Sequence, residues 1–141
     1  MAELVIGRMD QDHLRITISK RWSTNWFDAN VEIKCGAWSG NYTATFENGE
    51  LRSFASDIRR LYQDLSATVT FQQSEPYLSI SCKGDGRGHI WLTGVAEERP
   101  HQGPKLVFQF GLEQTELPQI ANSLDALDPR ITASSLSDTP H

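Results

Sequence analysis

The sequence predicts an α+β fold in which two antiparallel β-meanders are joined by an amphipathic helix and followed by a short C-terminal helix. Apolar and polar residues alternate in about seven short segments, three before the helix and four after it. Between the two sets, the spacing of apolar residues changes to three and four, which is typical of a helix. The connections between alternating segments are short, and short connections favour antiparallel neighbours.

The composition is that of a globular protein. The 141 residues are 38% hydrophobic and 22% charged, and Gly and Pro occur in ordinary numbers. We expect residues 1–128 to form a single domain. The segment 129–141 is rich in Ser, Thr, Asp and Pro and has no periodicity, so we expect it to be a disordered tail.

The first meander is predicted at 12–19, 28–35 and 40–47, after a leading segment at 1–10. In each strand one set of alternating residues is apolar and is expected to face the core. These sets are Leu14, Ile16 and Ile18, then Val31, Ile33 and Cys35, then Tyr42, Ala44 and Phe46.

The turn Asn48-Gly49 ends this meander and precedes the predicted helix at 51–65, because both residues tolerate positive φ. The helix would be about 21 Å long, enough to cross several strands. Its apolar face consists of Leu51, Phe54, Ala55, Ile58, Leu61, Tyr62 and Leu65.

The second meander is predicted at 67–72, 78–82, 89–96 and 106–112. A short second helix should follow, with Thr115 as its N-cap and Pro118 in its first turn, where a missing N–H has little effect. Its apolar face is Leu117, Ile120, Ala121, Leu124 and Leu127, and Pro129 follows its end.

No catalytic, metal or cofactor signature is present in the sequence. It contains no G-x-S-x-G, phosphate-binding loop, H-E-x-x-H or C-x-x-C motif. The four histidines lack the spacing of a metal site, and we expect them to be solvated or half-exposed. Cys35 and Cys82 end apolar sets and are expected to be reduced thiols in the core. The sequence therefore favours a binding protein without cofactor or metal over an enzyme.

The charge of the chain bears on its partners. A net charge of −5 and a pI near 5.3 argue against nucleic-acid binding, which needs Lys and Arg on phosphates. The same charge favours a basic protein partner. No apolar run approaches the roughly 20 residues of a membrane span and no signal peptide is evident, so we expect a cytoplasmic protein.

The tryptophans are the first candidates for partner contact. Trp22 and Trp26 flank a polar loop, Trp38 begins a strand, and Trp91 alternates out of the core register. Exposed Trp residues are frequent in binding sites. As an alternative, the N-terminal residues 4–6 or the last helix could cover Trp91.

Two loops supply further candidates. The turn at 83–89 contains three glycines with Asp85 and Arg87, and its side chains could contribute rim contacts. The loose loop at 97–105 begins with Glu97 and Glu98. We include these four charged residues as candidate partner-binding residues.

The order of these features resembles the WapI family of bacterial immunity proteins. The resemblance covers roughly residues 26–127 and consists of spaced apolar, aromatic and glycine positions: Trp26, Gly36, Gly40, Leu51, Phe54, Leu61-Tyr62, Ala67, Val69, Glu75-Pro76, Leu78, Gly88-His89-Ile90, Gly94, Leu106–Phe110 and Gln114-Thr115 with Leu117. It implies a cytoplasmic antitoxin that binds and blocks a cognate wall-associated nuclease toxin, with no catalytic residues to transfer.

Two other classes of function remain open. Exposed Trp residues on a sheet would suit an aromatic-rich module that binds a carbohydrate. Asp85, Arg87 and His89 could alternatively form part of a small hydrolase site assembled only in three dimensions.

Overall fold

Four antiparallel strands followed by a helix occur twice along the chain. The computed structural model describes residues 3–21, 23 and 25–129. The elements are β1 (Glu3–Gly7), β2 (His13–Arg21), β3 (Trp26–Cys35), β4 (Trp38–Glu47), α1 (Glu50–Gln63), β5 (Thr68–Gln72), β6 (Leu78–Gly84), β7 (His89–Glu97), β8 (Lys105–Glu113), the 3-10 turn η1 (Gln114–Glu116) and α2 (Leu117–Leu127). The predicted α+β class, the two meanders and both helices are confirmed.

The first meander has one strand more than predicted. Residues of the leading segment form β1, which pairs with β2 so that Leu4 lies opposite Ile16. Leu4 and Ile6 are buried and Val5 is half-buried. A segment of five residues with one alternation is too short to distinguish an edge strand from a leading coil.

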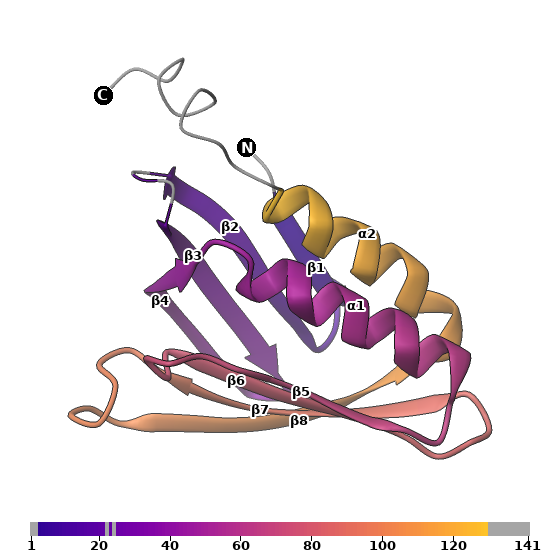
Figure 1. The fold of residues 1–141 in the computed structure, drawn as a ribbon. Coiled ribbons are helices and arrows are strands. Elements are labelled where there is room, and N and C mark those ends of the chain that lie inside the picture. Colours follow the sequence, from indigo (N-terminus) through magenta and orange to yellow (C-terminus); the bar gives the residue numbers. More distant parts are fainter. Residues whose placement is uncertain (1–2, 22, 24, 130–141) are drawn as a thin grey trace.

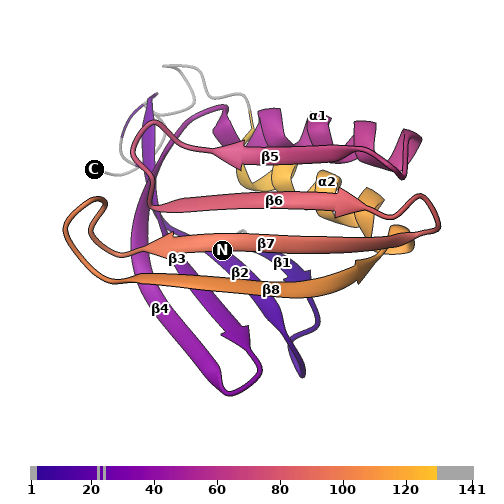
Figure 2. The same ribbon diagram turned by 90° about the horizontal axis from the view of Figure 1, so that it is seen from below.

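The two meanders form separate sheets, with strand orders β1-β2-β3-β4 and β5-β6-β7-β8. Their strands run in clearly different directions in Figures 1 and 2. The two helices lie side by side and run in opposite directions, with α1 against β5 and α2 against β1. The helices therefore close the side on which the two sheets diverge.

Aromatic rings join the two halves of the core. The ring of Phe27 stacks on Phe46 at 5.4 Å, and Phe71 of the second sheet lies 6.3 Å from Phe46 and 5.5 Å from Phe54 of α1. Both sheets and both helices contribute to one continuous cluster of buried residues. Burying each such side chain contributes about 1.5–3 kcal/mol, so this cluster ties the two halves together.

Several side chains differ from their predicted burial. Tyr62 is exposed because it follows Leu61 by about 100° around α1 and lies beside the apolar face. His13 is buried rather than solvated or half-exposed. Its two ring nitrogens contact Glu32 Oε2 at 2.8 Å and the Gln11 carbonyl at 3.0 Å. Cys82 is buried as predicted, but Cys35 is only half-buried at the end of β3. Both thiols are free.

The start of the second helix also differs from the prediction. Thr115 is not its N-cap, because η1 precedes α2 and Glu113 with Glu116 forms a capping box there. Pro118 does lie in the first turn of α2. The predicted tail at 129–141 lies outside the described residues except for Pro129. No helix in the described part of the chain is long and apolar enough to cross a membrane.

Candidate functional site

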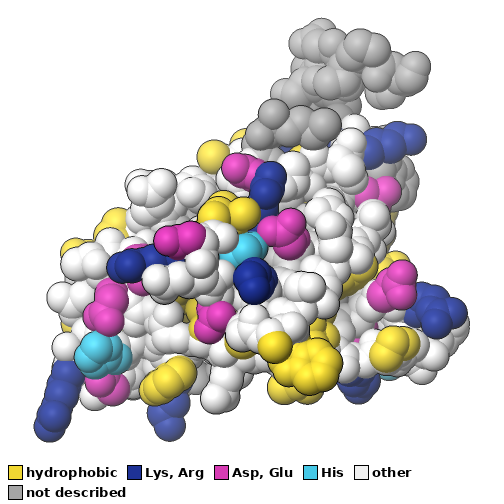
Figure 3. Space-filling view, turned by 180° about the vertical axis from the view of Figure 1, so that it is seen from behind, with side chains coloured by type: hydrophobic (Ala, Val, Ile, Leu, Met, Phe, Trp, Pro, Cys, Tyr) yellow, Lys and Arg dark blue, Asp and Glu magenta, His cyan; other side chains and the backbone are white. Residues whose placement is uncertain are grey.

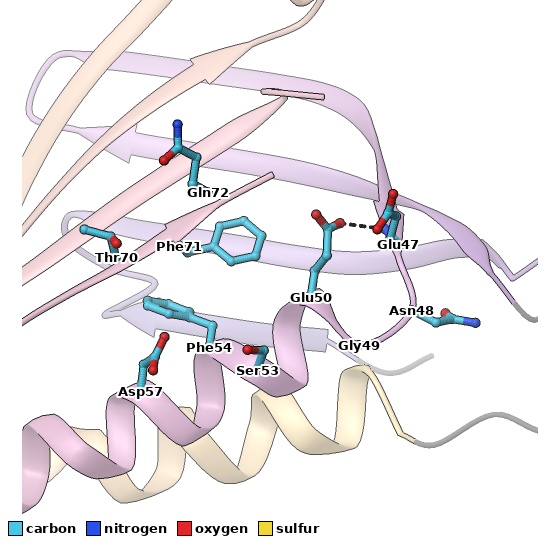
Figure 4. Close-up of a pocket in the computed structure, with 10 residues that line it drawn as sticks. All are labelled: Glu47, Asn48, Gly49, Glu50, Ser53, Phe54, Asp57, Thr70, Phe71 and Gln72. Carbon is cyan, nitrogen blue, oxygen red and sulfur yellow. Dashed lines mark hydrogen bonds between the residues drawn. The ribbon is translucent and has the colours of Figure 1, made fainter. Parts of the chain in front are cut away.

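A pocket of about 350 Å³ lies where β4 passes into α1, beside the edge of β5. Figure 4 shows the rings of Phe54 and Phe71 facing one another within it. The carboxylates of Glu50 and Asp57 lie on opposite sides of these rings, and Glu47 lies beyond Glu50 on the rim. We call this site the acidic pocket. Three carboxylates around an apolar floor suit a cationic side chain better than an anion.

Local backbone geometry positions the Glu50 carboxylate. Gly49 has φ of 100°, a conformation that a residue with a side chain rarely adopts, and it turns the chain from β4 into α1. The Glu47 N–H then donates to Glu50 Oε1 at 2.6 Å, and Gln73 Nε2 donates to the same oxygen at 3.2 Å. Partial burial raises the pKa of Glu50, although both hydrogen bonds oppose the shift.

The rim of the acidic pocket depends on a residue from the far end of the described chain. Gly49, the N-cap of α1, has no side chain to accept a hydrogen bond. The buried carboxylate of Asp128 takes this role and accepts from the N–H groups of Gly49, Leu51 and Arg52 at 2.8–3.1 Å. The residue after α2 therefore fixes the first turn of α1.

An apolar groove lies at the opposite edge of the second sheet, beside β8. A pocket of about 410 Å³ separates the β3–β4 hairpin from β8 and is lined in part by Trp38, Leu106 and Val107. Trp38 and Val107 are each 73% exposed. The Cys35 thiol donates to the Gln109 carbonyl at 2.9 Å and joins the hairpin to β8. Large exposed apolar side chains beside a concavity are typical of protein-binding surfaces.

The predicted tryptophan sites lie apart from one another. Trp91 is 56% exposed on the outward face of the second sheet, because neither β1 nor α2 covers that face. Trp26 is exposed at the start of β3, opposite Glu47 of the acidic pocket. Trp38 lies in the hairpin, and Trp22 lies outside the described residues. The described Trp residues do not form the common platform that a carbohydrate module needs.

The predicted charged residues of the 83–89 turn do not converge on a reaction centre. Asp85 accepts hydrogen bonds from the backbone N–H of Arg87 at 2.7 Å and of His89 at 3.2 Å, and the first of these is the main cause of a lowered Asp85 pKa. The His89 ring instead pairs with Glu113 at 3.1 Å. In the described ranges no cluster of three His, Cys, Asp or Glu side chains could hold a metal ion.

The two acidic residues at 97–98 have different environments. Glu97 is buried, and its carboxylate accepts from the His101 N–H at 3.3 Å, so it holds the loop between β7 and β8. The pKa of Tyr42 is raised, mainly by burial of its side chain and secondly by the negative charge of Glu97. The Tyr42 hydroxyl donates to the Tyr77 carbonyl at 2.6 Å. Glu98 is exposed and lines a pocket of about 240 Å³ that also includes Leu106.

Sequence analysis did not single out the acidic pocket or Val107. Glu47 and Glu50 flank the Asn48-Gly49 turn, and Asp57 lies on the polar face of α1, so their positions suggested only a turn and a solvated face. Val107 had a usable signal, because an apolar residue between inward-facing Leu106 and Phe108 must point outward.

Comparison with known proteins assigns the chain to a class of immunity proteins. A family model described as the immunity protein WapI-like family matches residues 4–128. The chain belongs to this family, as the resemblance in its sequence implied.

The other comparisons are more distant. No curated protein matches the chain. Among solved structures, a chain from the crystal structures of Trypanosoma bruciei MRP1/MRP2 is similar over 89% of this chain and 81% of its own, with 7% identity and a TM-score of 0.49.

Proposed function

We propose that the protein neutralises a cognate toxin domain by binding it, without catalysis and without a cofactor. The observation that carries this proposal is the match of residues 4–128 to an immunity protein family. The resemblance adds the finer expectation that the toxin is a wall-associated nuclease blocked in the cytoplasm. Asp85, Arg87 and His89 point to no shared reaction centre, which supports binding over hydrolysis.

Charge supports a basic toxin domain as the partner. The chain has a net charge of −5, and Glu47, Glu50 and Asp57 concentrate negative charge around a pocket. Complementary charge speeds association and suppresses wrong partners. The affinity should therefore fall as ionic strength rises, because salt screens exposed charges over roughly 8–10 Å.

The test is co-expression with the toxin domain encoded beside this protein. We expect restored growth and a complex that survives size-exclusion chromatography. In vitro, inhibition of the toxin should increase with the molar ratio of this protein to toxin and should be complete near a ratio of one to one. Inactivation of a large excess of toxin would indicate catalysis instead. If this protein neither restores growth nor forms a complex with any neighbouring toxin, the proposal is overturned.

A further inference from the structure

We propose that the toxin binds the outward face of the second sheet, with its cationic side chains in the acidic pocket and an apolar side chain in the groove beside Trp38. This inference rests on the proposed function and specifies the surface that performs it. We call this surface the docking face. It consists of the acidic pocket, the outward side chains of β5–β8 and the groove between Trp38 and Val107.

The concavities along the docking face adjoin one another. A depression of about 360 Å³ on the outward side of the sheet shares Thr70, Phe71 and Gln72 with the acidic pocket. The same depression shares Val107 with the groove beside Trp38. A partner surface that covers the sheet and reaches over its β5 edge to α1 can therefore contact all three. Figure 2 shows this sheet from its outward side, with both helices behind it.

The middle of the docking face is small, polar and uncharged. The depression is lined by Ser79, Ser81 and Thr93, together with the apolar side chains of Val95 and Val107. Short hydroxyl side chains allow close approach of a partner, and little charge must be desolvated there. Trp38, Trp91 and Val107 add exposed apolar area of the kind that dominates interface energetics.

The outward face of the first sheet provides the contrast. Two ion pairs lie on it: Arg15 contacts Glu3 at 2.9 Å and His13 contacts Glu32 at 2.8 Å. Figure 3 shows Lys, Arg, Asp, Glu and His side chains of both charge signs beside one another on this side of the molecule. A partner docking here would have to separate or desolvate these pairs. The depression in the middle of the second sheet is uncharged, and the outward His89–Glu113 pair of that sheet lies at the opposite end of its strands.

The charge distribution also selects the occupant. The carboxylates of Glu47, Glu50 and Asp57 lie at one end of the docking face and the apolar groove lies at the other. A basic protein with an exposed apolar residue satisfies both ends and is fixed in one orientation. A nucleic acid would bring phosphates against the three carboxylates, which disfavours it.

Two matched substitutions test the surface. Thr93→Arg places a long cation in the middle of the docking face, and Thr43→Arg places the same side chain on the outward face of the first sheet. Both threonines are exposed in strands. We expect Thr93→Arg to weaken toxin binding by about 100-fold or more, and Thr43→Arg by less than about threefold. Trp38→Ala should cost at least about 10-fold.

The outcomes separate the surface from the function. Binding is measured by calorimetry, and thermal unfolding of each variant confirms its fold. If the wild type binds the toxin but Thr93→Arg and Trp38→Ala bind equally well, the docking face is wrong and the proposed function stands. A loss with Thr43→Arg alone would move the site to the first sheet. A wild type that binds no toxin removes both proposals.

A nucleic-acid arm completes the test. A fluorescent single-stranded oligonucleotide is titrated into the wild type and into Trp38→Ala. We expect no binding to either at physiological salt. Binding that Trp38→Ala abolishes would assign the face to nucleic acid and overturn the proposal.

Discussion

The two halves of the molecule, β1–β4 with α1 and β5–β8 with α2, share one order of elements but start their helices differently. In the second half, Glu113 and Glu116 form a capping box at the 3-10 turn η1, which leads directly into α2. In the first half, Gly49 supplies no cap, and the N–H groups of α1 donate to Asp128 instead. One helix start is therefore local, and the other depends on the opposite half.

The outward faces of the two sheets also differ. Both sheets have inward-facing apolar sets, which is what folding requires of them. Their polar positions differ: the first sheet has the ion pairs Arg15–Glu3 and His13–Glu32, whereas the second has hydroxyl side chains beside exposed Trp91 and Val107, with the His89–Glu113 pair at the far end of its strands. A common core pattern therefore leaves the outward positions of each sheet free to specialise.

Replacing the shared cap should have the largest effect on stability. Asp128→Ala removes a buried carboxylate and leaves the N–H groups of Gly49, Leu51 and Arg52 without this partner. We expect the free energy of unfolding to fall by about 3–5 kcal/mol. Urea denaturation measures it. The control Asp125→Ala breaks only the partly exposed pair with Arg59 and should cost less than about 1 kcal/mol. Equal losses would show that α1 does not depend on this cap.

A pair of glycines tests the packing of each half. A Cβ on Gly94 of β7 would overlap the ring of Phe108, whereas one on Gly40 of β4 would lie 3.5 Å from Leu106 Cδ2. Gly94→Ala should therefore destabilise the protein by about 1–3 kcal/mol through overpacking. Gly40→Ala should change stability by less than about 0.5 kcal/mol. Thermal unfolding measures both, and a neutral Gly94→Ala would contradict the close contact.

The local cap of the second half should matter less than the remote cap of the first. Glu116→Ala removes the carboxylate that accepts from the Glu113 N–H at 2.7 Å. We expect a loss of about 0.5–1 kcal/mol in urea unfolding, because both residues are solvent-accessible and water can replace this hydrogen bond. A loss as large as that of Asp128→Ala would remove the proposed difference between the two helix starts.

The smallest expected effect concerns the charge of Glu50. Its pKa is raised in the folded state, mainly by burial, so the folded protein binds this proton more tightly than the unfolded chain does. Stability from this group is therefore gained as pH falls through the raised pKa and is lost above it. Glu50→Gln keeps an oxygen that accepts from the Glu47 N–H and should be slightly stabilising near pH 7.

The pH profile separates this effect from a simple change in packing. The advantage of Glu50→Gln over the wild type should shrink as pH is lowered through the raised pKa of Glu50, because the wild-type carboxyl then takes up its proton. Thermal unfolding across this range measures the difference. A difference that stays constant with pH would contradict the raised pKa.

The sequence predicted the elements that have their own periodicity. Leu51, Ile58 and Leu61 identified α1, and Phe108, Phe110 and Leu112 identified β8, because alternation and helical spacing are local properties. β1 was missed for lack of length. The crossing of the two sheets depends on contacts far apart in sequence, which no local pattern encodes.

The site was less predictable than the fold for the same reason. Trp38 and Trp91 were identified as exposed candidates from their residue type and register. The acidic pocket brings Asp57 near Glu47 and Thr70 only after α1 has packed beside β5. Asp128 and Gly49 are 79 positions apart, so their contact leaves no signal in either segment.

The hydrogen bonds of Asp128 also constrain how the protein is made. The first half leaves the ribosome before the second, with a helix whose opening turn still lacks its acceptor. The first sheet can form its hairpins early, but the cap of α1 can form only after residue 128 has emerged. Completion of the fold is thereby coupled to synthesis through residue 128.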